Sequence, residues 1–147
     1  MQIQSILKRV QLFAGLSIDD LDQLAAICTE VTCPPEDIII HQSTTGTEMY
    51  IIAEGEVEVF IQGGDDAIAR SLVLLGEGQV FGEMALIDQG HRSASIRARK
   101  RGCLLYKMER DAFYQLCETG SKIGFLVMRN LAIDIAFKLR HRNLTGM

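Results

Sequence analysis

The chain has 147 residues, of which 48% are hydrophobic and 23% charged, and its formal net charge is −4. This length and balance are those of one soluble globular domain with a core of its own, and the net negative charge gives no overall attraction to nucleic acid or to a membrane surface. No apolar run approaches the roughly 18 residues of a membrane span, and no signal-peptide pattern follows Lys8 and Arg9, so we expect a cytoplasmic protein.

Residues 1–28 are predicted to form a helical preface. Apolar residues at helical spacing predict a helix over Ile3 to Phe13, which ends at Gly15. Ser17 is the expected N-cap of a second helix, with acidic residues in the first turn and a buried face that extends to Cys28. We interpret this preface as packed against a larger unit, with contact to a partner protein as the alternative.

Residues 30–108 are expected to be strands. Pro34 and Pro35 stop any helix, and the run from Asp37 to Gln42 is rich in β-branched residues. Further strands are predicted over residues 49–53, 56–61, 68–75, 95–101 and 103–108, with turns at 43–46, Gly55, 62–66 and Gly102. This succession is typical of an antiparallel β-roll or jelly-roll barrel. The basic run at residues 97–101 is interpreted as the solvated face of a strand, and a nucleic-acid patch is the alternative.

The stretch from Gly78 to Ser95 interrupts these strands. A helical turn from about Glu83 to Ile87 begins with amides that have no partner within the helix, and such a terminus attracts anions. Arg92 adds a positive charge and a planar fork of donors that suits phosphate. A carboxylate beside a phosphate site is better explained as an acceptor for ligand hydroxyls, such as those of a ribose, so Glu83 and Arg92 together indicate a nucleotide.

A short helix that Asp111 starts or caps is followed by the longest predicted helix, over residues 121–143. Its apolar residues cover most of the circumference and leave only narrow polar strips, so the helix must bury more than one face. We expect one face against the barrel and another against a second copy of the chain, which gives a homodimer. A downstream domain that covers this helix is the alternative.

The stretch from Gly78 to Ser95 closely resembles the phosphate-binding cassette of the cyclic-nucleotide-binding domain family, of the catabolite-activator type. The matching residues are Phe81-Gly82-Glu83, Ala85-Leu86 and Arg92-Ser93-Ala94. The resemblance covers nearly the whole chain. It implies one domain over 1–147, with a helical preface (1–28), a β-roll of about eight strands (30–108) that carries the cassette (78–95), and C-terminal helices (109–143).

The resemblance also implies a role for each matching residue. Arg92 pairs with the cyclic phosphate, Glu83 accepts from the ribose 2′-OH, and Gly82 lets the backbone approach the sugar. The Ala85 amide and the Ser93 hydroxyl donate to phosphate oxygens.

The C-terminal helix covers the base in this family. By register, Leu139, Arg142 and Asn143 are the expected base contacts, and the predicted ligand-binding set also includes Phe81, Met84 and Ala94. His91 replaces the proline that many relatives have before the arginine, which leaves the site intact but makes the loop less rigid.

The expected function is therefore a sensor domain that binds a cyclic nucleotide, with cyclic AMP favoured and cyclic GMP as the alternative. The ligand favours one arrangement of the C-terminal helix, through a hinge near Glu118 to Ser121 that includes Gly120, and an unknown protein partner receives the signal. Neither a nucleophile–base pair nor paired carboxylates lie in the cassette, so we expect no enzyme and no cofactor besides the ligand.

Three other functions remain open. The first is a dimerisation module of the same fold that binds no nucleotide, in which Arg92 makes only a surface salt bridge, for instance to Glu83. The second is the sensor fragment of a larger transcription regulator whose DNA-binding module is absent here, so that this chain alone binds no nucleic acid. The third, a metal-dependent cupin-type enzyme, is disfavoured because the three histidines and four cysteines lack ligand spacing.

Overall fold

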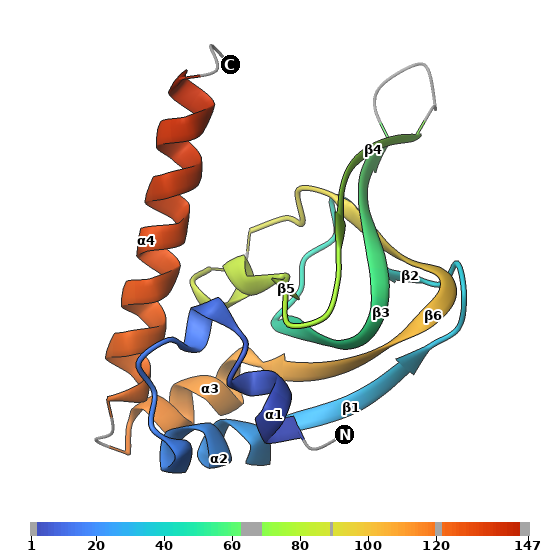
Figure 1. The fold of residues 1–147 in the computed structure, drawn as a ribbon. Helices are drawn as coiled ribbons and strands as arrows, with labels where there is room; N and C mark the ends of the chain where they lie inside the picture. Colours follow the sequence, from blue (N-terminus) through green and yellow to red (C-terminus); the bar gives the residue numbers. More distant parts are fainter. Residues whose placement is uncertain (1–2, 63–68, 89, 120–121, 145–147) are drawn as a thin grey trace.

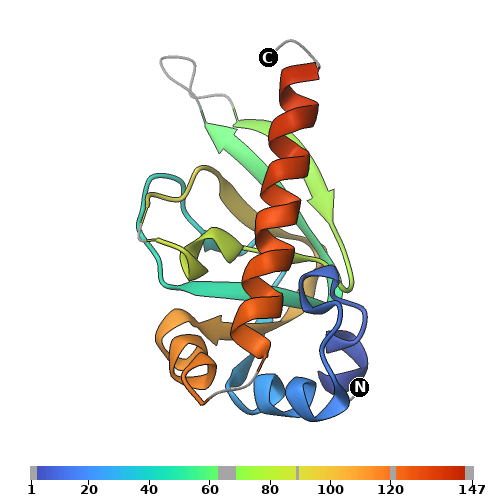
Figure 2. The ribbon, with the colours of Figure 1, turned by 90° about the vertical axis from the view of Figure 1, so that its left-hand side faces the viewer.

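The computed structural model describes residues 3–62, 69–88, 90–119 and 122–144. A rolled antiparallel sheet carries helices α1, α2 and α3 at one end, and the long helix α4 runs from that end along the side of the roll (Figures 1 and 2). The predicted fold class, mainly β with an N-terminal helical preface and a long C-terminal helix, is confirmed.

The sheet has six strands among the described residues, and all of their pairings are antiparallel. The strands are β1 (Cys28–Cys33), β2 (Ile38–Ile40), β3 (Glu48–Gln62), β4 (Ala69–Leu75), β5 (Val80–Phe81) and β6 (Ser95–Glu109). Their order is β1-β6-β3-β4, with β2 paired to β6 and β5 paired to β3. Strands β3 and β6 therefore form the centre of the roll, and β5 brings the cassette directly to β3.

Strands β3 and β6 are each continuous over 15 residues, so the predicted breaks at Gly55 and Gly102 are wrong, as is the expected total of about eight strands. Both glycines have positive φ, +88° and +70°, and the register between the two strands shifts at Gly55. They form bulges that bend the strands without ending the ladder. A Cβ on Gly55 would lie 2.4 Å from the Gly102 carbonyl oxygen, so the two bends pack directly on each other.

The predicted helix from Ile3 to Phe13 is instead two short pieces, α1 (Ile3–Leu7) and the 3₁₀ turn η1 (Gln11–Phe13). One straight helix would direct Leu12 away from the face that carries Ile6, Val10 and Phe13. The break lets all four side chains enter the core.

Helix α2 (Ile18–Ala26) begins at Ser17, as predicted. The Ser17 hydroxyl accepts from the Asp20 amide, and the Asp20 carboxylate accepts from the Ser17 amide. The predicted C-terminal extent was too long, because the helix ends at Ala26 and Cys28 is the first residue of β1.

Helix α3 (Arg110–Cys117) follows β6 directly, with Glu109 as N-cap and Asp111 in the first turn. Helix α4 (Ile123–Leu144) buries a stripe of Ile123, Val127 and Leu131 against the core that α1, η1 and α3 share. The predicted hairpin tip at 62–66 and the hinge at 118–121 fall largely on residues 63–68 and 120–121, which lie outside the described residues. No helix among the described residues is long and apolar enough to cross a membrane.

Candidate functional site

The cassette enters the roll through β5 and turns at Gly82 into the 3₁₀ turn η3 (Glu83–Leu86), close to the predicted position. The Phe81 ring stacks on the Tyr50 ring of β3, with centroids 5.1 Å apart. Gly82 has φ +75°, and a Cβ there would lie 3.1 Å from the Glu48 carbonyl oxygen and 2.9 Å from Arg92 Nη1. Only glycine therefore lets the turn approach β3 and Arg92 this closely.

The Arg92 side chain is folded into the protein and is only 9% exposed. Its Nη1 donates to the Gly82 carbonyl at 3.3 Å, and its Nη2 donates to the Glu48 carbonyl at 2.8 Å. Nη2 also lies 3.5 Å from Glu48 Oε1. Arg92 thus makes neither a surface salt bridge nor a pair with Glu83; its acidic partner is Glu48, which the sequence did not distinguish from other strand carboxylates.

Residues 46–50 form the surroundings that hold the Arg92 guanidinium in place. A Cβ on Gly46 would lie 2.2 Å from Arg92 Nη2, so any other residue at this position would displace the guanidinium. Glu48 Oε1 accepts from the Tyr50 hydroxyl at 3.3 Å, and burial followed by the Glu48 charge raises the pKa of Tyr50. The Arg92 Nε makes no hydrogen bond to a described residue, and Gly46 packs against it, since a Cβ there would lie 2.6 Å from Nε.

The Glu83 carboxylate is buried, and its Oε2 has no hydrogen-bond partner among the described residues. Burial raises the pKa of Glu83; the nearby Asp134 also raises it, while the charges of Lys138 and Arg92 oppose the shift. Glu83 lines a cleft of about 710 Å³ formed by the cassette, β4, α4 and residues 9–12, whose apolar lining includes Val73 and Phe137.

Helix α4 contributes a polar pair to this cleft that the sequence analysis did not assign to the site. Lys138 Nζ lies 2.9 Å from Asp134 Oδ2. Burial lowers the pKa of Lys138, but the hydrogen bond and charge of Asp134 and the charge of Glu83 outweigh it and raise the pKa. Both residues belong to one of the narrow polar strips of this helix, Asn130/Asp134/Lys138. This strip is the sequence signal that could have identified them.

The other predicted site residues are less closely gathered. Ser93 is exposed, and the Ala85 amide already donates to the Gly82 carbonyl at 3.1 Å. Met84 is 49% exposed, whereas Ala94 is partly buried.

On α4, Leu139 is 56% exposed and does not line the cleft, whereas its neighbours Phe137 and Lys138 do. Arg142 and Asn143 lie in α4, but their side chains are outside the described part. The base contacts of these three residues stay predictions. Among the described residues, no three histidine, cysteine or acidic side chains gather as metal ligands would.

Glu83→Gln is expected to stabilise the free protein at neutral pH, on the order of 1 kcal/mol, because a buried carboxylate with an unpaired oxygen is costly to ionise. The pKa of Glu83 is higher in the folded than in the unfolded protein, so the folded protein keeps this proton while the unfolded chain loses it, and stability falls as pH rises through that range. Urea unfolding across that pH range should show that the free energy of unfolding of Glu83→Gln exceeds that of the wild type by an amount that grows with pH. Glu30→Gln, which replaces an exposed acid of β1, is the control. If both substitutions raise the free energy of unfolding equally, the carboxylate of Glu83 carries no cost of burial.

Comparison with known proteins finds a matching family and several relatives. Residues 30–120 match the family described as cyclic nucleotide-binding domain. The chain is 34% identical over 140 residues to the cyclic AMP receptor protein of Thermus thermophilus, covering 94% of this chain and 61% of that protein.

Solved structures agree. The catabolite activator protein of Thermus thermophilus superposes with a TM-score of 0.81 at 32% identity, covering 92% of this chain and 61% of that one. The N-terminal domain of a transcriptional regulator from Streptomyces coelicolor gives a TM-score of 0.80 at 25% identity, covering 97% and 95%. The chain thus spans about 61% of the length of the Thermus relative.

Proposed function

The chain belongs to the cyclic nucleotide-binding domain family, and on this premise we propose that it binds a cyclic nucleotide, cyclic AMP, between the cassette and α4. The proposed activity is binding without turnover. The cyclic phosphate pairs with the Arg92 guanidinium, whose Nη atoms are held by the Gly82 and Glu48 carbonyls. A guanidinium held in this way binds phosphate with little loss of side-chain freedom.

The observation that carries the proposal is the unpaired, buried Oε2 of Glu83. A buried carboxylate oxygen is costly unless a donor reaches it, and the 2′-hydroxyl of a ribose is such a donor. Glu83 is also close enough to Arg92 for the arginine's charge to lower its pKa, so one nucleotide could contact both.

A mutant cycle with 2′-deoxy-cyclic AMP tests this contact. Removing the ligand hydroxyl should weaken binding to the wild type about tenfold or more, the value of one hydrogen bond to a charged group. Glu83→Ala should bind both ligands alike, because it has no acceptor left to lose. The same loss in both proteins would remove Glu83 from the ribose site.

The base is proposed to enter the cleft between β4 and α4. Val73, Ile133 and Phe137 line it and are between 47% and 59% exposed, so a purine ring would cover apolar surface that now faces solvent. The choice of cyclic AMP over cyclic GMP is supported by the name of the Thermus relative.

Signal transmission is proposed to start at Lys138. Its ammonium lies 2.9 Å from Asp134 Oδ2 of its own helix, and the charge of Glu83 of the cassette also raises the pKa of Lys138. A ligand that contacts Glu83 changes the charges that act on Lys138 and so favours one position of α4 over another. The domain division 1–28, 30–108 and 109–143, and relay to a downstream protein partner, remain part of this proposal.

A homodimer through α4 is supported by a second apolar stripe. Phe125, Met128, Ala132, Ile135 and Leu139 follow alternating spacings of three and four residues, the pattern of a two-stranded coiled coil. Phe125 and Leu139 are 69% and 56% exposed, whereas Met128 and Ile135 are partly buried against the core, so the exposed part of the stripe borders the face that holds α4 on its own domain. We propose that two copies pack along it.

A role within a larger transcription regulator is the second candidate. The match to the N-terminal domain of the Streptomyces coelicolor regulator, over 97% of this chain and 95% of that domain, favours it. On this proposal the two α4 helices of the homodimer transmit the ligand signal to a further module, and the domain itself binds no nucleic acid.

A further inference from the structure

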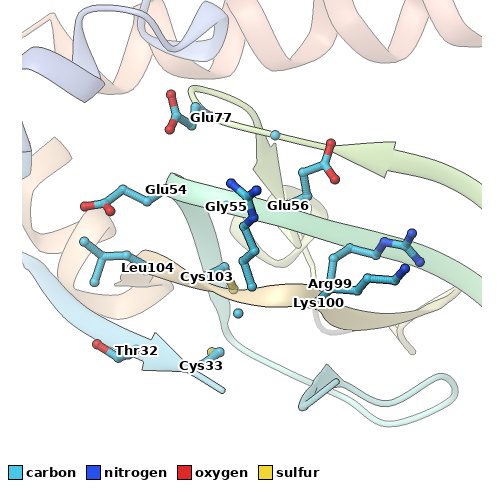
Figure 3. A pocket seen from close by; sticks show the side chains of 13 residues that line it. Thr32, Cys33, Glu54, Gly55, Glu56, Glu77, Arg99, Lys100, Cys103 and Leu104 are labelled. Carbon is cyan, nitrogen blue, oxygen red and sulfur yellow. The ribbon is translucent and has the colours of Figure 1, made fainter. Parts of the chain in front are cut away.

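A second cleft, of about 910 Å³, lies away from the cassette, where β1, β3 and β6 meet at the bends of Gly55 and Gly102. Two of the four free cysteines, Cys33 of β1 and Cys103 of β6, line it (Figure 3). The cyclic-nucleotide proposal uses neither thiol.

Strand register places the two cysteines face to face. Cys33 and Cys103 are direct partners in the antiparallel pairing of β1 and β6. Direct partners point to the same face, with Cα atoms about 4.5 or 5.5 Å apart, within the span of about 4.4–6.8 Å that a disulfide requires. The other two cysteines differ, since Cys28 opposes Met108 and Cys117 packs against Gly124 of α4.

The glycine bends keep larger side chains away from the pair. A Cβ on Gly55 would lie 3.1 Å from the Cβ of Cys103, so any other residue there would crowd the thiol. Cys33 and Cys103 are only 5% and 7% exposed. The pair is therefore accessible through the cleft to a small reagent and closed to a bulky one.

Burial raises the pKa of both thiols, that of Cys103 to about 12. Both are therefore mainly protonated at neutral pH. The small fraction of thiolate is the nucleophile of the pair.

We propose that Cys33 and Cys103 are a reversible oxidation site at which a hydroperoxide converts the two thiols into a cross-strand disulfide. One of the two sulfurs attacks a peroxide oxygen, the O–O bond breaks, and that cysteine becomes a sulfenic acid while water leaves. The sulfur of the other cysteine then displaces the sulfenic oxygen as a second water and forms the S–S bond. Two thiols lose two electrons and two protons, and one hydrogen peroxide gives two waters.

Hydrogen peroxide added to the reduced full chain tests the site, with thiols counted after quenching and denaturation. The number of free thiols should fall from four to two, with a single Cys33–Cys103 linkage in the peptide map, and dithiothreitol should restore all four. The double variant Cys28→Ser/Cys117→Ser is the matched control and should form the same linkage at the same rate.

Single variants test whether both cysteines are needed. Cys33→Ser and Cys103→Ser should each form no intramolecular disulfide and should each stop at a sulfenic acid on the remaining member of the pair, which dimedone traps. Circular dichroism melting of each variant establishes that it is folded. Four free thiols remaining in the treated wild type, or a different linkage, would overturn the proposal.

Discussion

Arg92→Leu is expected to weaken cyclic AMP binding at least about a hundredfold, because it removes two or more charge-assisted hydrogen bonds at about 1.5–3 kcal/mol each. The protein should still fold and dimerise. Arg92 contacts Gly82 of the cassette and Glu48 of β3, and the Glu48 side chain is 25% exposed, so water can solvate its carboxylate once the arginine is gone.

Isothermal titration calorimetry of nucleotide-free protein measures this loss. Arg101→Leu, at an exposed arginine of β6 outside the cassette, is the matched control and should bind as the wild type does. Equal affinities for Arg92→Leu and the control would remove Arg92 from the phosphate site. Loss of binding together with loss of the dimer would instead mean that Arg92 holds the fold together.

Phe125→Glu is expected to convert the dimer into a monomer at micromolar concentration. Each phenylalanine that loses burial costs about 1.5–3 kcal/mol, and a two-fold axis doubles the loss, so the dissociation constant should rise about a hundredfold or more. The monomer should remain folded, since Phe125 is 69% exposed and a glutamate there can pair with Arg129 one turn along α4.

Sedimentation equilibrium measures the association. Ile18→Glu replaces an apolar side chain of similar exposure, 64%, on α2, and should leave the dimer unchanged. A wild type that is monomeric at high micromolar concentration, or a Phe125→Glu protein as dimeric as the control, would exclude the α4 stripe as the interface.

Local patterns in the sequence were sufficient to predict most of the fold. The N-cap at Ser17 and the helical turn after Gly82 are each encoded within a few residues, and both are present. The long strands were missed because Gly55 and Gly102 are turn signals by local chemistry. Their packing on each other, across 47 positions of sequence, is what keeps the ladder continuous.

The cassette was predictable for the same reason: Glu83 and Arg92 lie nine positions apart in one recognisable stretch. Glu48 and Lys138 were missed because they reach the site from β3 and α4, and their relation to it exists only in the folded chain. Leu139, placed by register alone, lies outside the cleft that its neighbours line, because one position on a helix turns a side chain by about 100°.

Direct titration of the nucleotide-free wild-type chain with cyclic AMP, with cyclic GMP and 5′-AMP as comparison ligands, tests whether the cassette binds a cyclic nucleotide. We expect a saturable heat for cyclic AMP, weaker binding of cyclic GMP, and much weaker binding of 5′-AMP, whose open phosphate brings a second negative charge close to the Glu83 carboxylate. Absence of heat at millimolar cyclic AMP would contradict this expectation, as would equal binding of the cyclic and open phosphates.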